Sequence, residues 1–233
     1  VYEPYLREIG AADADDAVFA SGDFCPIMDL GHADMAYEWM YGAVPTRSGL
    51  VNQALSKQLK DGFSAYQASL ALQGKDGFGR ITADNYAAYL LKAYLVPSAN
   101  QYLRTLAEEP RAAYLAKNPW LKWSGAGASF TFADYLAHVG RMKGLPAFDD
   151  FDMKQPEPSL FGDRNTPARH FTDFSLRQAT GNPAARVDDE VRTLVDLMNP
   201  MHFILQNNPG AAGHWWIRMG TADNHTSLAV IGN

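Results

Sequence analysis

Cysteine is almost absent from this sequence. The 233 residues include a single cysteine, Cys25. One cysteine excludes an internal disulfide and any zinc site built from cysteine alone. Cys25 lies in an apolar run and directly precedes Pro26. We therefore predict a reduced thiol packed in the core rather than a nucleophile.

Positive charge and long apolar runs are also scarce. The formal net charge is −6, and no cluster of five or more Lys and Arg residues occurs. Because binding to a phosphate backbone needs a basic patch, the sequence predicts no nucleic-acid partner. No apolar run approaches the roughly 18 residues that cross a bilayer, so no membrane partner is predicted. The segment that begins at Val1 has no features of a targeting signal.

The motifs that carry catalysis or bind metal are missing as well. A hydrolase nucleophile on a tight strand-to-helix turn needs Gly-x-Ser-x-Gly, because larger neighbours would clash there. The nearest match, Gly127-Ala-Ser129, lacks the second glycine. The six histidines show no His-Glu-x-x-His pattern and no zinc-binding spacing with Cys25. These residues alone do not support catalysis, and we expect neither a metal nor another cofactor.

The most informative segment that is present is an apolar run followed by an acidic loop. His214–Gly220 predicts an interior strand of a parallel sheet, buried on both faces. Reactive groups of α/β proteins lie beyond the carboxyl ends of strands, where Asp223 follows Gly220. Asp223 is therefore a candidate triad acid. The alternative is that its carboxylate only accepts backbone N–H groups in an Asx turn.

The remaining pattern predicts a short buried strand within Ala17–Ile27, many helices and then the second strand. The expected helices are Ala33–Tyr41, Gly49–Leu72, Ala83–Leu95, Ser98–Leu106, Arg111–Leu115, a helix capped by Thr131 that ends near Gly144, and Arg186–Met198. Pro146–Asn165 is expected to be a long loop, and Asn207–Gly210 a turn. This order indicates an α/β protein with a large helical insertion between two parallel strands. The predicted divisions are residues 1–45 for the first part of the core, 46–165 for the insertion and 166–233 for the return to the core.

A small polar cluster follows the first predicted strand. His32 lies near Asp29 and Asp34, at a position where a substrate pocket opens in many α/β sheets. We favour the alternative that Asp29 or Asp34 caps the following helix.

Six segments together resemble a known family. They are Tyr2–Gly10, Ala17–Ile27, His32–Trp39, Ala168–Thr172, Met198–Met201 and Arg218–Ser227. In this order they resemble the bacterial tannase-like α/β-hydrolases, the group of subtype B tannases and carboxylesterases. The segments span nearly the whole chain, although none of them is diagnostic alone.

The resemblance implies part of an α/β-hydrolase fold with a mainly helical lid inserted between strands of a parallel sheet. In that family the nucleophile elbow precedes a segment like Val1–Ala12, and the triad histidine follows the strand that bears the acid. The chain is thus implied to supply Asp223, while remaining core segments or a second chain supply the serine and the histidine. Localisation stays unknown, and only the resemblance points to a secreted or periplasmic protein.

His225 departs from the family pattern. Tannases carry a second carboxylate two residues after the triad acid, where it contacts hydroxyl groups of a galloyl ring. This sequence has His225 at that position, which puts a galloyl preference in doubt. His225 is a candidate substrate-binding residue because it can hydrogen-bond a phenolic or carbonyl oxygen. The alternative is a loop residue that faces solvent.

The preferred functional hypothesis is a serine carboxylester hydrolase, similar to tannases and feruloyl esterases. Its partner would be a small-molecule ester of a small acid, aromatic acids included. The first alternative is a non-enzymatic helical binding module whose apolar surface is lined by Trp39, Trp120, Trp123, Trp215 and Trp216. The second is another α/β-hydrolase activity, a peptidase or an acyltransferase.

Overall fold

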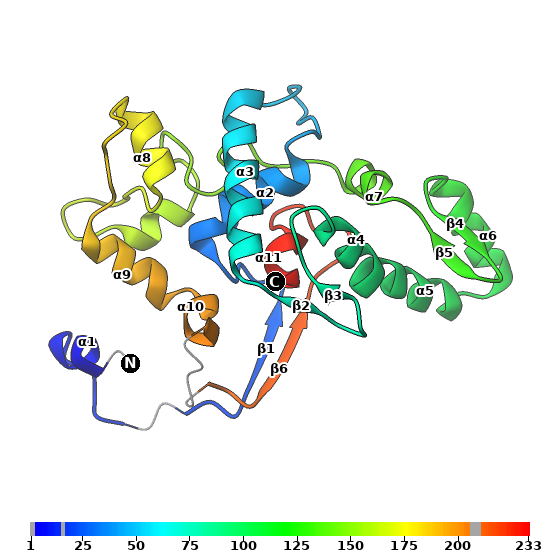
Figure 1. Cartoon of the computed structure of the whole chain (residues 1–233), viewed down its shortest axis with the longest axis horizontal. Helices are drawn as coiled ribbons and strands as arrows, with labels where there is room; N and C mark the ends of the chain where they lie inside the picture. The colour runs from blue at the N-terminus through cyan, green and yellow to red at the C-terminus, as the bar shows by residue number, and fades with distance from the viewer. Residues whose placement is uncertain (1–2, 15–16, 206–210) are drawn as a thin grey trace.

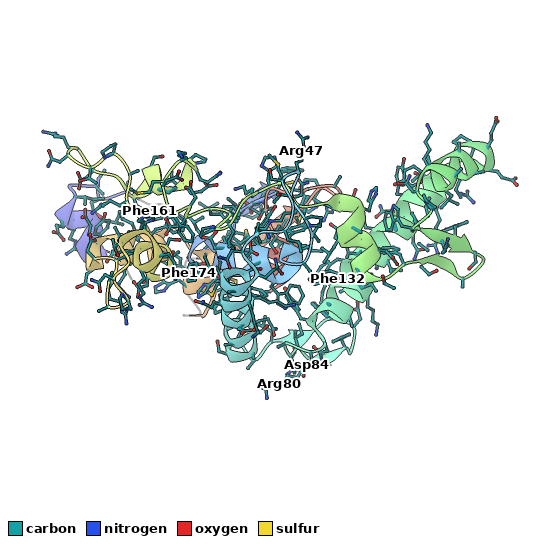
Figure 2. The ribbon with its side chains drawn as sticks, turned by 90° about the horizontal axis from the view of Figure 1, so that it is seen from above. Arg47, Arg80, Asp84, Phe132, Phe161 and Phe174 are labelled. Atoms are coloured by element: carbon teal, nitrogen blue, oxygen red, sulfur yellow. The ribbon has the colours of Figure 1, made fainter. Side chains whose placement is uncertain are left out.

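The computed structural model describes residues 3–14, 17–205 and 211–233. Figure 1 shows a central group of helices, one helical arm on either side and a two-stranded sheet below. Seen from above in Figure 2, Phe161 and Phe174 lie in one arm, and Phe132 lies where the other arm begins. The predicted turn Asn207–Gly210 lies outside the described residues.

The two predicted strands pair in parallel. Strand β1 (Ala20–Phe24) runs beside β6 (His214–Arg218), with Ala20 opposite His214 and Phe24 opposite Arg218. The predictions that β1 is buried and that β6 is buried on both faces are wrong. Among the described residues β6 pairs with β1 alone, and a strand is buried on both faces only where other elements cover both.

Helix α2 (Leu30–Tyr41) forms the centre of the molecule and confirms the helix predicted there. It packs against α3 (Gln53–Ser69), which is shorter than predicted. The side chain of Asn52 sets the start of α3, because its Oδ1 accepts hydrogen bonds from the backbone N–H groups of Ala54 and Leu55 at 3.0 and 3.2 Å.

The core combines aromatic rings from α2, α3 and segments in the middle of the chain. Its largest fully buried side chains include Tyr37, Tyr41, Phe63, Tyr86 and Phe148. The short helix α11 (Leu228–Gly232) enters this core, and the hydroxyl of Tyr86 donates to the carbonyl oxygen of Ala229. The sequence pattern did not predict α11.

One arm contains the segments between α3 and residue 140. A short hairpin of β2 (Gln73–Gly74) and β3 (Gly79–Arg80) precedes α4 (Tyr86–Leu90). A π-helical turn, η1 (Leu91–Leu95), joins α4 to α5 (Val96–Thr105), so two predicted helices are continuous.

The same arm continues through α6 (Glu108–Lys117), the hairpin of β4 (Lys122–Ser124) and β5 (Gly127–Ser129), and α7 (Phe132–Val139). The Thr131 cap of α7 is confirmed as a capping box with Asp134. The helix ends before its predicted limit near Gly144, because Gly140 has φ of 75°.

The opposite arm contains η2 (Glu157–Phe161), α8 (Asp173–Thr180), α9 (Asp189–Leu197), α10 (Pro200–Leu205) and, at its edge, α1 (Glu3–Glu8). Helix α9 begins later than predicted because Asp188 caps it, accepting from the N–H of Val191 at 2.9 Å. Pro200 follows α9 and also opens α10, since proline fits the first turn of a helix.

The architecture is therefore a small parallel sheet accompanied by many helices, which confirms the α/β class at this level. Through the described part of the chain, every helix falls short of the length and apolarity needed to cross a membrane.

Candidate functional site

Asp223 lies in the loop that follows β6, and its carboxylate organises that loop. The backbone N–H of Asp223 donates to the carbonyl oxygen of Gly220 at 3.1 Å. Its Oδ1 accepts from the backbone N–H groups of His225 and Thr226 at 2.9 and 3.4 Å. The Asx turn considered from the sequence is thus present. It holds a half-buried carboxylate beyond the carboxyl end of a parallel strand.

Cys25 lies beside Asp223, and the prediction that it is buried in the core is wrong. The residue is exposed and has φ of 51°, so the chain turns at the end of β1 and directs the side chain toward the Asp223 loop. The backbone N–H of Cys25 donates to the carbonyl oxygen of Arg218 at 2.7 Å. The N–H of Gly220 donates to Sγ of Cys25 at 3.3 Å.

The hydrogen bond from Gly220 lowers the pKa of the Cys25 thiol. A hydrogen bond to Asp223, partial burial and the negative charge of Asp223 together outweigh it, so the net pKa is raised. The thiol form is therefore favoured, and it contacts the candidate acid.

Asp223 and His225 line a cavity of about 380 Å³ together with Cys25, Lys143 and Glu157. Lys143 Nζ lies 3.3 Å from Glu157 Oε1, and both side chains are mostly buried. Glu157 Oε2 is buried and has no hydrogen-bond partner within the described chain. A buried carboxylate oxygen without a donor is costly unless a ligand or water satisfies it, which marks this cavity as a candidate binding site.

Lys143 and Glu157 were missed by the sequence interpretation. Lys143 falls at the predicted end of a helix, and Glu157 falls in a segment predicted to be a loop. Neither position carries a motif. Only the fold brings them to Asp223.

Lys143 is fixed by contacts with α2. The guanidinium group of Arg141 forms a fully buried ion pair with Glu38, and its Nε donates to the carbonyl oxygen of Lys143 at 2.8 Å. The hydroxyl of Tyr37 accepts from the N–H of Lys143 at 3.1 Å and donates to the carbonyl oxygen of Asn224 at 2.8 Å. One helix therefore positions both walls of the cavity.

His225 is exposed at the rim of this cavity. Its backbone N–H donates to Oδ1 of Asp223, and its side chain makes no hydrogen bond within the described part of the molecule. The imidazole is thus accessible to a ligand in the cavity and also to solvent.

Asp29 is the N-cap residue of α2, but the side-chain caps predicted for Asp29 and Asp34 are wrong, because both carboxylates are buried and bind distant segments. Asp29 accepts from Nδ1 of His32 at 2.8 Å, from the Tyr66 hydroxyl at 2.6 Å and from Nδ2 of Asn199 at 2.9 Å. It makes no side-chain cap to α2.

Asp34 accepts from the backbone N–H groups of Phe148 and Asp149 at 2.7 and 3.1 Å. His32 and Asp34 line a cavity other than the one beside Asp223. The polar cluster thus serves mainly to hold the fold together.

A metal centre is not evident, since the described residues contain no group of three or more His, Cys, Asp or Glu side chains arranged to bind a metal ion. A carboxylate beyond a parallel strand, next to a partly buried polar cavity, is the arrangement of a small-molecule site in an α/β protein.

The sequence and the structure of the chain were compared with those of known proteins. No family model matches the sequence. No curated protein sequence matches it significantly. Among solved structures, a tannin acyl hydrolase in complex with 3,4-dihydroxybenzoate is 33% identical, with a TM-score of 0.80 over 99% of this chain and 51% of that one.

Tannase from Lactobacillus plantarum is 31% identical, with a TM-score of 0.80 over 99% of this chain and 53% of that one. Tannase from Fusobacterium nucleatum is 32% identical, with a TM-score of 0.76 over 98% and 54%. The resemblance to tannases predicted from the sequence is confirmed across nearly the whole chain. The chain spans about half the length of these tannases.

Proposed function

We propose that this chain is the lid and acid-bearing part of a serine carboxylester hydrolase that acts on esters of small aromatic acids. The observation that carries the proposal is the position of Asp223, beyond a parallel strand and on the wall of a partly buried polar cavity. The likeness to tannases over nearly the whole chain supports an ester hydrolase.

In the proposed mechanism Asp223 orients the catalytic base. A serine attacks the ester carbonyl while a histidine takes its proton and returns it to the leaving alcohol. The carboxylate of Asp223 accepts from Nδ1–H of that histidine, selects its tautomer and stabilises it when it is charged. The serine and the histidine come from the remaining core segments or from a second chain.

The cavity beside Asp223 would hold the acyl group. Glu157 Oε2 lacks a partner and would accept a hydrogen bond from a phenolic hydroxyl, while Lys143 would donate to the same ring substituents. His225, at the rim, would hydrogen-bond a phenolic or carbonyl oxygen. Related structures contain 3,4-dihydroxybenzoate and ethyl gallate, which are small aromatic ligands of this kind.

The proposed organisation follows the strand order. Residues 1–45 and 166–233 would contribute β1 and β6 to an α/β-hydrolase core, and residues 46–165 would form the lid. The side chains of Phe19, Phe24 and Trp216 on and beside the strands are more than half exposed. Such a surface would be covered by further core segments.

The first experiment replaces Asp223 in the intact enzyme. Asp223→Asn should lower kcat for ethyl gallate by roughly 10⁴ while the fold is retained, because the amide would stabilise the wrong histidine tautomer. Asp84→Asn is the matched control, since Asp84 is exposed and lies at the edge of the molecule in Figure 2. A loss of less than about tenfold in the Asp223 variant would overturn the assignment.

Labelling of the nucleophile separates a serine hydrolase from a non-enzymatic binding module. A fluorophosphonate probe should label a serine outside Val1–Asn233 if the proposal is correct. Labelling of a serine within the chain would contradict the placement of the nucleophile, and no labelling would favour a binding module.

The alternative of a binding module predicted that five tryptophans line one apolar surface. The structure does not place them on one common surface. Trp39 packs between Phe63 and Tyr86 in the core, and Trp120 packs against Phe130. Trp216 is the most exposed of the tryptophans, and it belongs to β6.

A further inference from the structure

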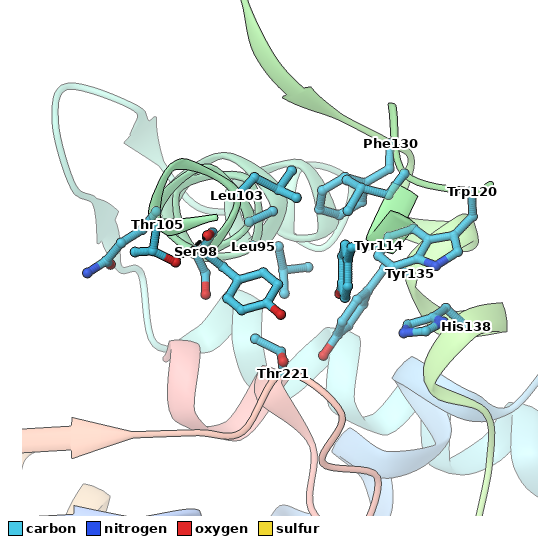
Figure 3. Close-up of a pocket in the computed structure, with 14 residues that line it drawn as sticks. Leu95, Ser98, Leu103, Thr105, Tyr114, Trp120, Phe130, Tyr135, His138 and Thr221 are labelled. Carbon is cyan, nitrogen blue, oxygen red and sulfur yellow. Dashed lines mark hydrogen bonds between the residues drawn. The ribbon is translucent and has the colours of Figure 1, made fainter. Parts of the chain in front are cut away.

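A cavity lies between α2, α3, α8 and α9, apart from the candidate catalytic loop. Its volume is about 530 Å³, which lies within the range of small-molecule sites. The aromatic cavity in Figure 3 reaches the catalytic loop through Thr221. By contrast, none of the described residues that line the cavity between the four helices belongs to that loop. The four helices therefore enclose a site that is separate from the proposed ester site.

Apolar side chains form the inner wall of this cavity. They come from the four helices and from the segments that precede α8 and α9: Met35, Leu59, Phe171, Phe174, Val187 and Val195. Leu59, Phe171 and Val187 are buried. The ring of Phe171 stacks on that of Phe161 with centroids 4.7 Å apart. This wall is therefore a firm surface for an aromatic or branched aliphatic group.

Two opposite charges of α9 line the cavity without neutralising each other. Arg192 and Asp196 are four residues apart, a spacing at which helix side chains can pair, yet within the described residues no ion pair joins them. Nε and Nη2 of Arg192 instead donate to the carbonyl oxygen of Val187 and to the carboxylate of Asp173, both at 3.1 Å. Oδ1 of Asp196 lies 3.8 Å from Nδ1 of His202. A cation and an anion thus lie side by side on one helix, each held away from the other.

The charge of Asp173 does not cancel that of Arg192. Nη2 of Arg177 and Nε of Arg186 also lie 2.9 and 3.3 Å from the Asp173 carboxylate. Three guanidinium groups therefore share one carboxylate, which leaves positive charge for an anionic group of a ligand. The side chains of Arg192 and Asp196 are 46% and 50% exposed, so a ligand can reach both of them.

His32 adds a fixed hydrogen-bond acceptor from α2. The start of α2 touches α9, since a Cβ on Gly31 would lie 3.1 Å from Cγ1 of Val195. Nδ1 of His32 lies 2.8 Å from Oδ1 of Asp29, and the imidazole stacks on the ring of Tyr66 with centroids 3.6 Å apart. In the neutral ring Nδ1 carries the proton, and Nε2, which has no hydrogen bond within the described part of the chain, is left as an acceptor.

We propose that this cavity binds a free α-amino acid with an aromatic or branched aliphatic side chain. The carboxylate of the amino acid accepts from Arg192, its ammonium group donates to Asp196 and to Nε2 of His32, and its side chain packs on the apolar wall. A zwitterion meets both charges of α9 at once, whereas a simple carboxylate meets only Arg192 and a simple amine only Asp196. The site does not depend on the proposed ester hydrolysis.

Titration calorimetry on the intact enzyme tests the site with three probes that share a phenyl ring. They are L-phenylalanine, 3-phenylpropionate, which lacks the ammonium group, and phenethylamine, which lacks the carboxylate. L-phenylalanine should bind, and the other two should displace it only at concentrations at least about tenfold higher, because each lacks one hydrogen bond between charged groups. Displacement excludes binding of a probe at another site. Absence of L-phenylalanine binding, or equal displacement by all three probes, would overturn the proposal.

Variants then assign each charge. Arg192→Gln and Asp196→Asn should each weaken L-phenylalanine binding by at least about tenfold. Directly titrated phenethylamine should bind Arg192→Gln as it binds the unmodified enzyme, since it has no carboxylate to lose a partner. Arg80→Gln and Asp84→Asn are the matched controls, because both residues are exposed and lie at the edge of the molecule in Figure 2.

Asp196→Asn keeps the test decisive even if Arg192→Gln does not fold, because Asp196 is half exposed. Unchanged L-phenylalanine affinity in Asp196→Asn, or an equal loss in the control variants, would show that the cavity is not the site. The titrations need no turnover, so their outcome is separate from that of the Asp223→Asn experiment.

Discussion

Cys25 joins the two strand ends at the candidate catalytic loop. Its backbone N–H donates a hydrogen bond to the carbonyl oxygen of Arg218, and its sulfur accepts one from the N–H of Gly220 at 3.3 Å. Removing the sulfur would remove one of the contacts that hold the loop of Asp223, beside those of Tyr37 and Tyr41 with its backbone. In the intact enzyme, Cys25→Ala should therefore lower kcat by up to about tenfold, which is the range of one lost hydrogen bond.

The measurement is steady-state kinetics with a pH profile. Cys25→Ser retains a donor and an acceptor, so its loss should be smaller than that of Cys25→Ala. A change in KM alone, or equal activity of Cys25→Ala and the unmodified enzyme, would show that Cys25 does not position Asp223.

Asp34 makes stability depend on pH. Burial raises its pKa from 3.8 to about 7, and the hydrogen bonds from Phe148 and Asp149 offset only part of the shift. At a pH between these two pKa values, the Asp34 carboxyl keeps its proton in the folded protein and has released it in the unfolded chain. The contribution of this proton to stability is complete below about pH 4 and is lost as the pH rises through about 7.

Urea unfolding of the unmodified protein and of Asp34→Asn should show this effect, because the amide does not titrate. The advantage of the unmodified protein over the variant should shrink by up to about 4 kcal/mol from pH 4 to pH 7, which is three pKa units. A difference that is constant or grows with pH would contradict the prediction.

The placement of Asp223 could be predicted from the sequence because it depends on a local pattern, an apolar run closed by glycine. The roles of Lys143, Glu157 and Asp29 could not. Their partners lie far along the chain, so the contacts exist only once the helices have packed. The predicted burial of Cys25 was wrong for the same reason. Its neighbours in the sequence are apolar, but the direction of its side chain is set by the backbone turn at φ of 51°.

Helices were predictable where caps and periodicity agree. The capping box of Thr131 and the apolar face of α3 both appear in the structure. The hairpins β2–β3 and β4–β5 contain strands of only two or three residues. Strands this short show no alternation, so nothing in the sequence separated them from turns.

Helix α2 is anchored to the segment after α7 by the buried ion pair of Glu38 and Arg141. Both side chains are fully buried, and the hydroxyl of Ser56 also donates to Glu38 at 2.6 Å. Glu38→Gln would leave the Arg141 charge buried without a partner. Its expected cost is about 3–5 kcal/mol in the free energy of unfolding, measured by urea denaturation.

The exposed pair of Lys57 and Asp61 on α3 provides a control. Asp61→Asn should cost less than about 1 kcal/mol, because water screens this pair. If Glu38→Gln costs no more than Asp61→Asn, the buried pair does not anchor the two elements. Since Arg141 also holds Lys143, Glu38→Gln should in addition raise KM in the intact enzyme.

At the scale of the whole molecule, the order of strands and helices in the sequence predicts that β1 pairs with β6. The same sequence does not reveal how far this pair of strands is buried. Apolar runs predict that a strand is buried, but the covering elements need not lie in the same segment. Phe24 packs on Trp216 with ring centroids 5.4 Å apart, yet these side chains are 68% and 52% exposed. The strand pair thus has the composition of an interior sheet and the exposure of a surface.

The proposed hydrolase core makes a definite prediction for Trp216. If further core segments cover β6 in the intact enzyme, Trp216→Ala should reduce the free energy of unfolding by about 3–5 kcal/mol, the cost typical of a buried tryptophan. Leu160→Ala is the matched control, since Leu160 is 56% exposed and its replacement should change stability by less than about 1 kcal/mol. Urea denaturation of the intact enzyme measures both. Equal effects of the two substitutions would mean that β6 stays exposed and that this sheet is not continued by other strands.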